Sequence, residues 1–454
     1  MRINWLMLFV FGLLALPVQA DVHEFILDNG MKVLVKPDHR APVVVSQVWY
    51  KVGSAYEYDG ITGVSHALEH AMFKGTEAHP AGEFSEIIAA NGGDENAFTG
   101  RDYTAYFQHI ASDRLELCLR LEADRMRNLL LEEEEFLKEI EVIKEERRLR
   151  TDDRPTALTF EKFNAVAYLN SPYGQPVIGW MSDLDAMTIE DLRRWYRTWY
   201  APNNAILVVV GDVDPKDVLR TAKKYFGDLE TSEIPSLKPR KEVEHRGKRR
   251  IQVKAPAELP YLIMGYKVPV LLTAEDESEV YALEVLAWLL DGGNSARLTN
   301  NLVRGQQIAA GVGAGYSLYD SQGSLFVLSG TPAKGVAVEA LEKALKEQIS
   351  SILTNPPTQS ELDRVKAQVV ASAIYQEDSL YYQAMEIGSL ETIGIGWRKK
   401  DEYVKKIQEV TAGQVKEVAE KYLQDERLTV AELVPLPITE PPKPPKGEMR
   451  HDVR

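Results

Sequence analysis

The stretch NAILVVVGDVDPKDVLRTAKKYFGDL, residues 204–229, determines how the chain divides into domains. Its first ten residues are rich in branched apolar side chains, which is typical of a strand, and the residues from Asp214 have the apolar spacing of a helix. The residues at 231–250 are polar, contain proline and lack apolar periodicity, which predicts a linker. We therefore expect one domain at 21–230 and a second at 251–435.

The second half of the chain repeats the order of the first half. It has strand-like segments at 261–270 and 324–332, a helix at 282–293, further amphipathic helices and a closing strand at 427–436. This repetition predicts an α+β fold of two similar α/β-sandwich domains, each a mostly antiparallel sheet packed with helices, related by internal duplication.

The length of the chain indicates more than one domain, and its charge argues against nucleic-acid binding. A chain of 454 residues exceeds what one hydrophobic core usually supports, and 44% hydrophobic with 27% charged residues is an ordinary globular balance. The net charge is -15 and no basic run is longer than GKRR at 247–250, which argues against nucleic acid as a partner.

The two ends of the chain differ in composition from its body. Residues 1–20 combine Arg2, an apolar run and a small-residue ending at Ala20, which predicts a cleaved signal peptide and a periplasmic or secreted protein. The alternative is an uncleaved N-terminal anchor. No later segment approaches 18 unbroken apolar residues, so we expect no stable membrane insertion after cleavage. The tail at 436–454 is rich in proline and charge, which predicts disorder.

Cysteine chemistry is not expected. Cys118 is the only cysteine, so the chain cannot form an internal disulfide, and its setting in LELCLRLEADRM predicts a buried helix position.

The segment SHALEHAMFKGT at 65–76 has two histidines four positions apart and a glutamate directly before the second. On an α-helix His66 and His70 share a face, and Glu69 lies beside them. This geometry suits a metal ion, and the order H-x-x-E-H is the inverted-zincin signature. Because the pattern fixes only three positions, the motif alone leaves open a surface histidine pair that binds nothing.

A catalytic zinc ion needs a third protein ligand, and the segment FLKEIEVIKEERRLR at 136–150 is the best source. Its apolar residues have helical spacing, and Glu139 and Glu146 lie seven positions apart on one stripe. A half-buried carboxylate needs a partner, which zinc would supply for Glu146. Glu139 would hold a ligand histidine or another polar group.

Zinc at this place would support hydrolysis. The ion lowers the pKa of its water to about 7 and polarises a carbonyl, while a nearby carboxylate takes the proton of the water and passes it to the leaving amine. Glu69 is placed to be that base.

The chain resembles the pitrilysin family of metallopeptidases, which includes insulin-degrading enzyme and mitochondrial processing peptidase. The resemblance spans residues 23–435 and rests on four blocks, at 63–76, 91–107, 139–155 and 171–214. In the family the third ligand is a glutamate 76 positions past the second histidine, which supports Glu146 over Glu145, and a helper carboxylate matches Glu139. The resemblance implies a domain fold like that of LuxS and the processing peptidases, one zinc ion per chain, and dimers that enclose a chamber.

The resemblance also implies how substrate is held. Family members bind an extended peptide as an added strand on a sheet edge next to the zinc, a general recognition mode. The matching segment is NAFT at 96–99, with Asn96, Ala97 and Phe98 as candidate substrate-binding residues. For Asn96 the alternative is a capping residue in a turn after two glycines.

One departure from the family pattern concerns subunits. Active members carry an arginine followed seven positions later by a tyrosine that contact the substrate carbonyl; here Arg304 is present but position 311 is Gly311. Tyr316 and Tyr319 lie several residues away along the chain. Either the chain is the catalytic subunit of a heterodimer whose second pitrilysin-like subunit supplies the pair, or it is a homodimer that stabilises the oxyanion differently.

We therefore expect an exported zinc-dependent endopeptidase that hydrolyses oligopeptides or unfolded polypeptides. Two other classes stay open, a non-catalytic peptide-binding subunit and a zinc hydrolase that does not act on peptides. The intact set of His66, Glu69, His70 and Glu146 argues against the first.

Overall fold

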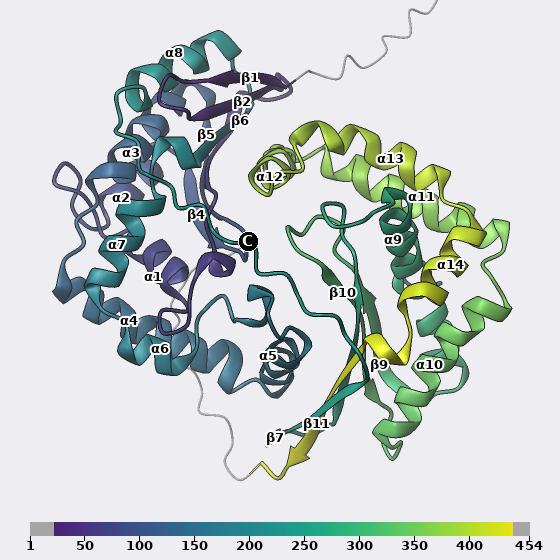
Figure 1. The fold of residues 1–454 in the computed structure, drawn as a ribbon. Coiled ribbons are helices and arrows are strands. Elements are labelled where there is room, and N and C mark those ends of the chain that lie inside the picture. The colour runs from purple at the N-terminus through teal and green to yellow at the C-terminus, as the bar shows by residue number, and fades with distance from the viewer. Residues whose placement is uncertain (1–21, 439–454) are drawn as a thin grey trace, which may run out of the picture.

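The computed structural model describes residues 22–438, in two halves that each contain one mixed sheet (Figure 1). The first sheet has the strand order β1-β2-β6-β3-β5-β4, and its only parallel pair is β2 with β6. Its strands are β1 (His23–Ile26), β2 (Lys32–Pro37), β3 (Val43–Tyr50), β4 (Asp94–Thr99), β5 (Thr104–Ala111) and β6 (Ala205–Gly211).

The second sheet has the order β7-β11-β8-β10-β9, and again one pair, β7 with β11, is parallel. Its strands are β7 (Arg249–Pro256), β8 (Tyr261–Val268), β9 (Ala309–Gly315), β10 (Ser324–Pro332) and β11 (Leu428–Leu436). The prediction of an α+β fold with two similar, mostly antiparallel sheets is confirmed.

Helices cover one face of each sheet and build its main core. In the first half these helices are α1 (Val64–Ala71), α2 (Glu83–Ala90), α3 (Leu115–Asn128), α4 (Glu133–Arg147), α6 (Met181–Ala186), α7 (Ile189–Trp199) and α8 (Pro215–Phe226). In the second half they are α9 (Glu277–Asp291), α10 (Val338–Thr354), α11 (Gln359–Gln376), α13 (Lys400–Glu409) and α14 (Ala412–Tyr422). Cys118 lies buried in α3, as its sequence setting predicts.

The other face of each sheet is covered by a helix from the opposite half. Helix α12 (Leu380–Thr392) packs on β3 and β6 of the first sheet, and α5 (Pro155–Ala167) packs on β7 and β11 of the second (Figure 1). The first sheet can bury both faces because successive residues of β6, all of them buried, point alternately to the two sides.

Each exchanged helix meets its sheet at a glycine. A Cβ on Gly388 of α12 would lie 2.2 Å from the indole ring of Trp49, and a Cβ on Gly265 of β8 would lie 2.5 Å from the ring of Phe163 in α5. Only glycine allows the backbone to approach these large buried rings so closely.

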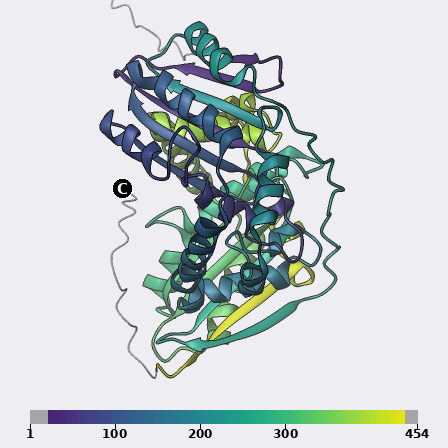
Figure 2. The ribbon, with the colours of Figure 1, turned by 90° about the vertical axis from the view of Figure 1, so that its left-hand side faces the viewer.

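Ion pairs and the linker also join the halves. Lys36 of β2 lies 2.7 Å from Glu377 beside α12. The linker runs along the outside of the molecule (Figure 2), and its Glu242 accepts hydrogen bonds from the backbone amides of residues 169–171 at 2.9–3.1 Å. From the end of α8 to Lys248 there is no regular helix or strand, and β7 then begins at Arg249.

Within residues 22–438, no helix has the length and apolar character needed to cross a membrane. The predicted signal peptide at 1–20 lies outside the described residues, as does the tail from residue 439 onward.

Candidate active site

The first two candidate ligands lie on α1, whose first turn is held by a close backbone contact and by a buried carboxylate. Gly63 precedes the helix with φ +89°, and a Cβ there would lie 2.5 Å from the Ile178 carbonyl oxygen. The buried carboxylate of Glu57 accepts hydrogen bonds from the amides of Gly63 (2.7 Å) and Ser65 (2.8 Å), so it satisfies the first turn in place of a side-chain cap. His66 follows directly, and its place is set by this anchored turn.

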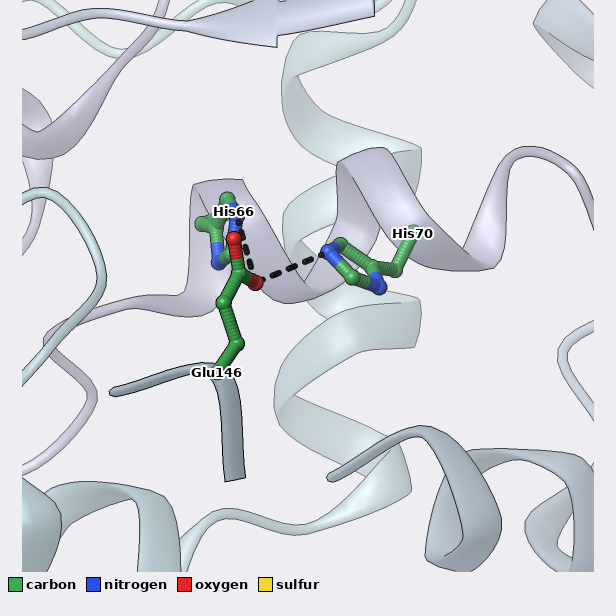
Figure 3. Close-up of side chains that lie close together, drawn as sticks. All are labelled: His66, His70 and Glu146. Carbon is green, nitrogen blue, oxygen red and sulfur yellow. Dashed lines mark ion pairs between the residues drawn. The ribbon is translucent and has the colours of Figure 1, made fainter. Parts of the chain in front are cut away.

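The third candidate ligand comes from α4, which packs across α1. Oε2 of Glu146 lies 3.6 Å from Nε2 of His66 and 3.5 Å from Nε2 of His70 (Figure 3). One ligand atom from each of the three residues lies within 4.8 Å of the others. The structure therefore brings together the three residues that the sequence assigns to zinc.

The polar atoms of this group fit a metal ion. Oε2 of Glu146 is buried and has no hydrogen-bond partner among the described residues, and a buried carboxylate oxygen without a partner is costly. Two imidazoles and one carboxylate are a known ligand set for catalytic zinc, which leaves one position open.

The electrostatics of the three residues are strongly coupled. Burial and the neighbouring His70 lower the pKa of His66 to about 4. Burial alone would raise the pKa of Glu146, but His70, His66 and Arg150 outweigh it and lower that pKa to about 2. At neutral pH Glu146 is thus charged and His66 is neutral, the forms that bind metal.

Glu139 holds the outer side of His70, as predicted for a helper carboxylate. Its Oε2 lies 3.3 Å from Nδ1 of His70, and its Oε1 lies 2.7 Å from Nζ of Lys74. Burial would lower the pKa of His70, but Glu139 and Glu146 together raise it to about 9. A carboxylate on Nδ1 leaves Nε2 of His70 to face the metal position.

Glu69 has the position and environment of a general base. It lines the same cavity as His66, and its Oε2 accepts a short hydrogen bond from the hydroxyl of Thr99 in β4. Burial raises the pKa of Glu69, and the Thr99 hydrogen bond opposes that change. A carboxylate with a raised pKa binds a proton more readily, which is what a general base must do.

The candidate substrate strand β4 is an edge strand of the first sheet, next to this cavity of about 560 Å³. Ala97 and Phe98 line the cavity; Asn96 is exposed and is not part of its lining. The amide of Ala97 donates to Oδ1 of Asn96 at 2.8 Å, so the side chain of Asn96 occupies a backbone donor of β4.

Arg304 is not brought to the site. It is exposed in the segment Thr299–Gly305, donates to the Asn294 carbonyl oxygen at 2.9 Å and does not line the cavity. Tyr316 packs against the second core and donates to the Pro269 carbonyl oxygen at 2.7 Å, so it does not take the place of a tyrosine at position 311.

Three residues around the site were not singled out in the sequence: Thr99, Lys74 and Arg150, which lies 2.8 Å from Oε1 of Glu146. Helical spacing gave a signal for Arg150, which lies four positions after Glu146, but not for Lys74, whose contact is with Glu139 on another helix. Thr99 had no such signal, since its contact joins a strand to a helix thirty residues away.

The fold and the site define a metallopeptidase with an H-x-x-E-H helix. His66, His70 and Glu146 would hold the zinc ion, which when bound lowers the pKa of a water to about 7 and polarises a carbonyl. Thr99 contacts the carboxylate of Glu69, which would take up a proton, and Glu139 contacts His70, which it would orient.

Comparisons with known proteins agree with this class. The model of the insulinase family (peptidase family M16) matches residues 32–180, and that of the peptidase M16 inactive domain matches residues 186–369. The zinc protease PqqE of Helicobacter pylori is 36% identical over 363 residues, which are 79% of this chain and 80% of that protein. The chain belongs to peptidase family M16, as a two-domain zinc protease.

Solved structures show the same architecture. The crystal structure of a protease from Helicobacter pylori has a TM-score of 0.87 at 31% identity and covers 92% of this chain and 100% of its own. The periplasmic protease PqqL of Escherichia coli shares the fold, with a TM-score of 0.77 at 21% identity over 91% of this chain and 48% of its own.

Proposed function

We propose that the chain is an exported endopeptidase that hydrolyses peptide bonds in oligopeptides or unfolded polypeptides with one zinc ion per chain. The observation that carries this proposal is the position of the free edge of β4 beside Glu69 and His66, in one open cavity. An extended peptide added to that edge would pair through its backbone, and such pairing has little sequence preference. Its scissile bond would lie near the Thr99 end of the strand.

Zinc content and cleavage of a quenched fluorescent peptide by the purified chain test this proposal. We expect about one zinc ion per chain, and Glu69→Gln should retain the metal but lose about a hundredfold or more in kcat/KM, as expected for a general base. Cleavage that Glu69→Gln leaves unchanged would refute the assigned role of Glu69.

We further propose that the active assembly is a heterodimer in which a second pitrilysin-like subunit supplies the arginine and tyrosine. The support is that Arg304 lies outside the cavity and that no tyrosine occupies position 311. Losing an oxyanion donor costs about a hundred- to a thousandfold in rate, so a lone chain should be weak. The other outcome is a homodimer that is fully active by itself.

Two variants, each with one glycine replaced by tyrosine, test whether the lone chain lacks a tyrosine that a partner would supply. An added Cβ on Gly311 meets nothing within 4 Å, and the same holds for Gly315 on the same strand, so both positions accept a side chain. If the chain lacks only a tyrosine, Gly311→Tyr should raise cleavage by the lone chain and Gly315→Tyr should not. Purification from the native host should yield a second chain, and isolation of this chain alone with full activity would refute the heterodimer.

Export is supported by the composition of residues 1–20. Fractionation of the native cells and N-terminal sequencing should find the protein outside the cytoplasm, starting at Asp21.

A further inference from the structure

The cavity beside the metal ligands contains a cation that has no partner. Arg101 lies in the turn between β4 and β5 and lines the same cavity as His66 and Glu69. Across residues 22–438, no carboxylate lies within 4.0 Å of its guanidinium group and no atom accepts a hydrogen bond from it. A guanidinium group has five N–H donors, so this side chain retains its full capacity to bind an anion.

Arg150, the other guanidinium group that lines the cavity, is already paired, as is the carboxylate of Glu161. Arg150 pairs with Oε1 of Glu146 at 2.8 Å. Glu161 pairs with Arg147 at 2.7 Å and 3.0 Å. Arg101 is therefore the cation of the cavity that remains available to bind an anionic ligand, in a chain whose net charge is -15.

Asp320, a carboxylate of the second half, does not form an ion pair with Arg101. Asp320 accepts a hydrogen bond from the hydroxyl of Ser317 at 3.0 Å, and burial raises its pKa. Burial thus disfavours its charged form and outweighs the opposing effect of the Arg101 charge, and its oxygens lie beyond ion-pair distance of Arg101.

Arg101 is held in place by both halves of the chain. Its carbonyl oxygen accepts a hydrogen bond from the amide of Ala55 at 2.8 Å, and its guanidinium carbon lies 4.9 Å from the centre of the Tyr173 ring. The Tyr173 hydroxyl donates to Asp102, and Ser321 of the second half donates to Asp102 through its hydroxyl at 2.5 Å and to the Tyr173 oxygen through its amide at 3.0 Å. The aromatic platform under the guanidinium is thus fixed by buried hydrogen bonds.

The sequence position of Arg101 relative to β4 places it near the reacting groups. Arg101 lies two residues beyond Thr99, whose hydroxyl contacts Glu69. Arg101 and Thr99 line the same cavity, so the guanidinium group can serve a substrate residue close to the scissile bond.

We propose that Arg101 determines specificity by binding a carboxylate of the peptide substrate close to the scissile bond. This inference rests on the proposed peptidase function. The carboxylate belongs either to an Asp or Glu side chain or to the free C-terminus of the peptide. A planar guanidinium group pairs with either through two parallel hydrogen bonds.

The test uses quenched fluorescent peptides that differ at one position, with Glu, Gln or Lys moved stepwise around the cleavage site. Each peptide is made with a free and an amidated C-terminus, which separates the two sources of carboxylate. The proteins are the wild type, Arg101→Gln, Arg101→Glu and the control Arg114→Gln. Arg114 is exposed at the opposite end of β5, outside the cavity.

For the wild type we expect kcat/KM for the best Glu peptide to exceed that for its Gln counterpart about tenfold, as one partly exposed charge-assisted hydrogen-bond pair would give. Arg101→Gln should bring this ratio near one, Arg101→Glu should favour the Lys peptide, and Arg114→Gln should keep the wild-type ratio. If the wild type instead cleaves the Glu and Gln peptides equally but prefers a free to an amidated C-terminus, and Arg101→Gln loses that preference, the substrate C-terminus is the ligand. Arg101 variants that match the wild type both in the Glu-to-Gln ratio and in the effect of amidation would overturn the proposal.

The Gln peptide separates this inference from the proposed function. If no protein cleaves either the Gln or the Glu peptide, the peptidase proposal fails, and binding then tests Arg101. Fluorescence anisotropy with labelled Glu and Gln peptides on the zinc-loaded Glu69→Gln protein should show tighter binding of the Glu peptide, and Arg101→Gln in the same background should abolish the difference. Equal binding of the Glu and Gln peptides before that second change, with no effect of amidation, would refute a carboxylate site at Arg101.

Discussion

Replacing Glu139 by Gln should weaken zinc binding about tenfold. The carboxylate contacts Nδ1 of His70 at 3.3 Å, and loss of such an outer contact typically costs about ten- to a hundredfold in metal affinity. The lower end applies here because the contact is long and Lys74, at 2.7 Å, already takes part of the charge. A tenfold loss corresponds to about 1.4 kcal/mol of binding free energy.

Competition with a chromogenic chelator at pH 7 measures this change. The control is Glu135→Gln, one turn earlier on α4, where the carboxylate pairs only with Lys138 at 2.7 Å within the described chain. The control should bind zinc as the wild type does. Equal zinc affinities for Glu139→Gln and wild type would show that Glu139 does not orient His70.

The same contact predicts how many protons zinc displaces. The pKa of His70 in the metal-free protein is about 9, above neutral pH, so the imidazole is protonated at pH 7 and must lose that proton to bind metal. Calorimetry in buffers of different ionisation enthalpy should find release of about one proton, and affinity should rise with pH up to about 9. Glu139→Gln lowers this pKa, so it should release less.

Two further substitutions test the surroundings of the site. Thr99→Val removes the hydrogen bond that lowers the pKa of Glu69, so the acid limb of the kcat/KM profile should move to higher pH; an unchanged profile would exclude Glu69 as the titrating base. Gly388→Ala places a Cβ 2.2 Å from Trp49 and should destabilise the fold by about 1–3 kcal/mol in urea unfolding. The helical control Gly413→Ala meets nothing closer than 3.8 Å and should stay within about 1 kcal/mol; equal midpoints for the two variants would mean that α12 shifts without cost.

The zinc site was predictable because it depends on helical spacing. The four-residue interval fixes His66 and His70 on one face of α1, and the seven-residue interval fixes Glu139 and Glu146 on one face of α4. The resemblance to the pitrilysin family then selected Glu146 over Glu145. That α4 crosses α1 at this place is a property of the tertiary fold, which local spacing does not contain.

Several of the features that sequence reasoning missed depend on contacts outside the regular spacing of one helix or strand. Glu57 caps α1 from a separate loop, and Ser321 reaches Asp102 across the two halves. The sheets and the main helices followed from periodicity. The exchange of α5 and α12 did not, because each helix is amphipathic whichever sheet it covers.

The exchange of helices bears on how such a chain arose. In the first half α5 is the third helix after the β4–β5 hairpin, and in the second half α12 is the third helix after the β9–β10 hairpin, so the two occupy equivalent places in the duplicated order. In a protein made of a single half, this helix would have to pack on the sheet of a second copy. The present chain thus has the topology of a domain-swapped dimer whose two subunits are joined by a linker. If the chain is cut within the linker, the two fragments should remain associated, because each fragment covers the sheet of the other with a helix.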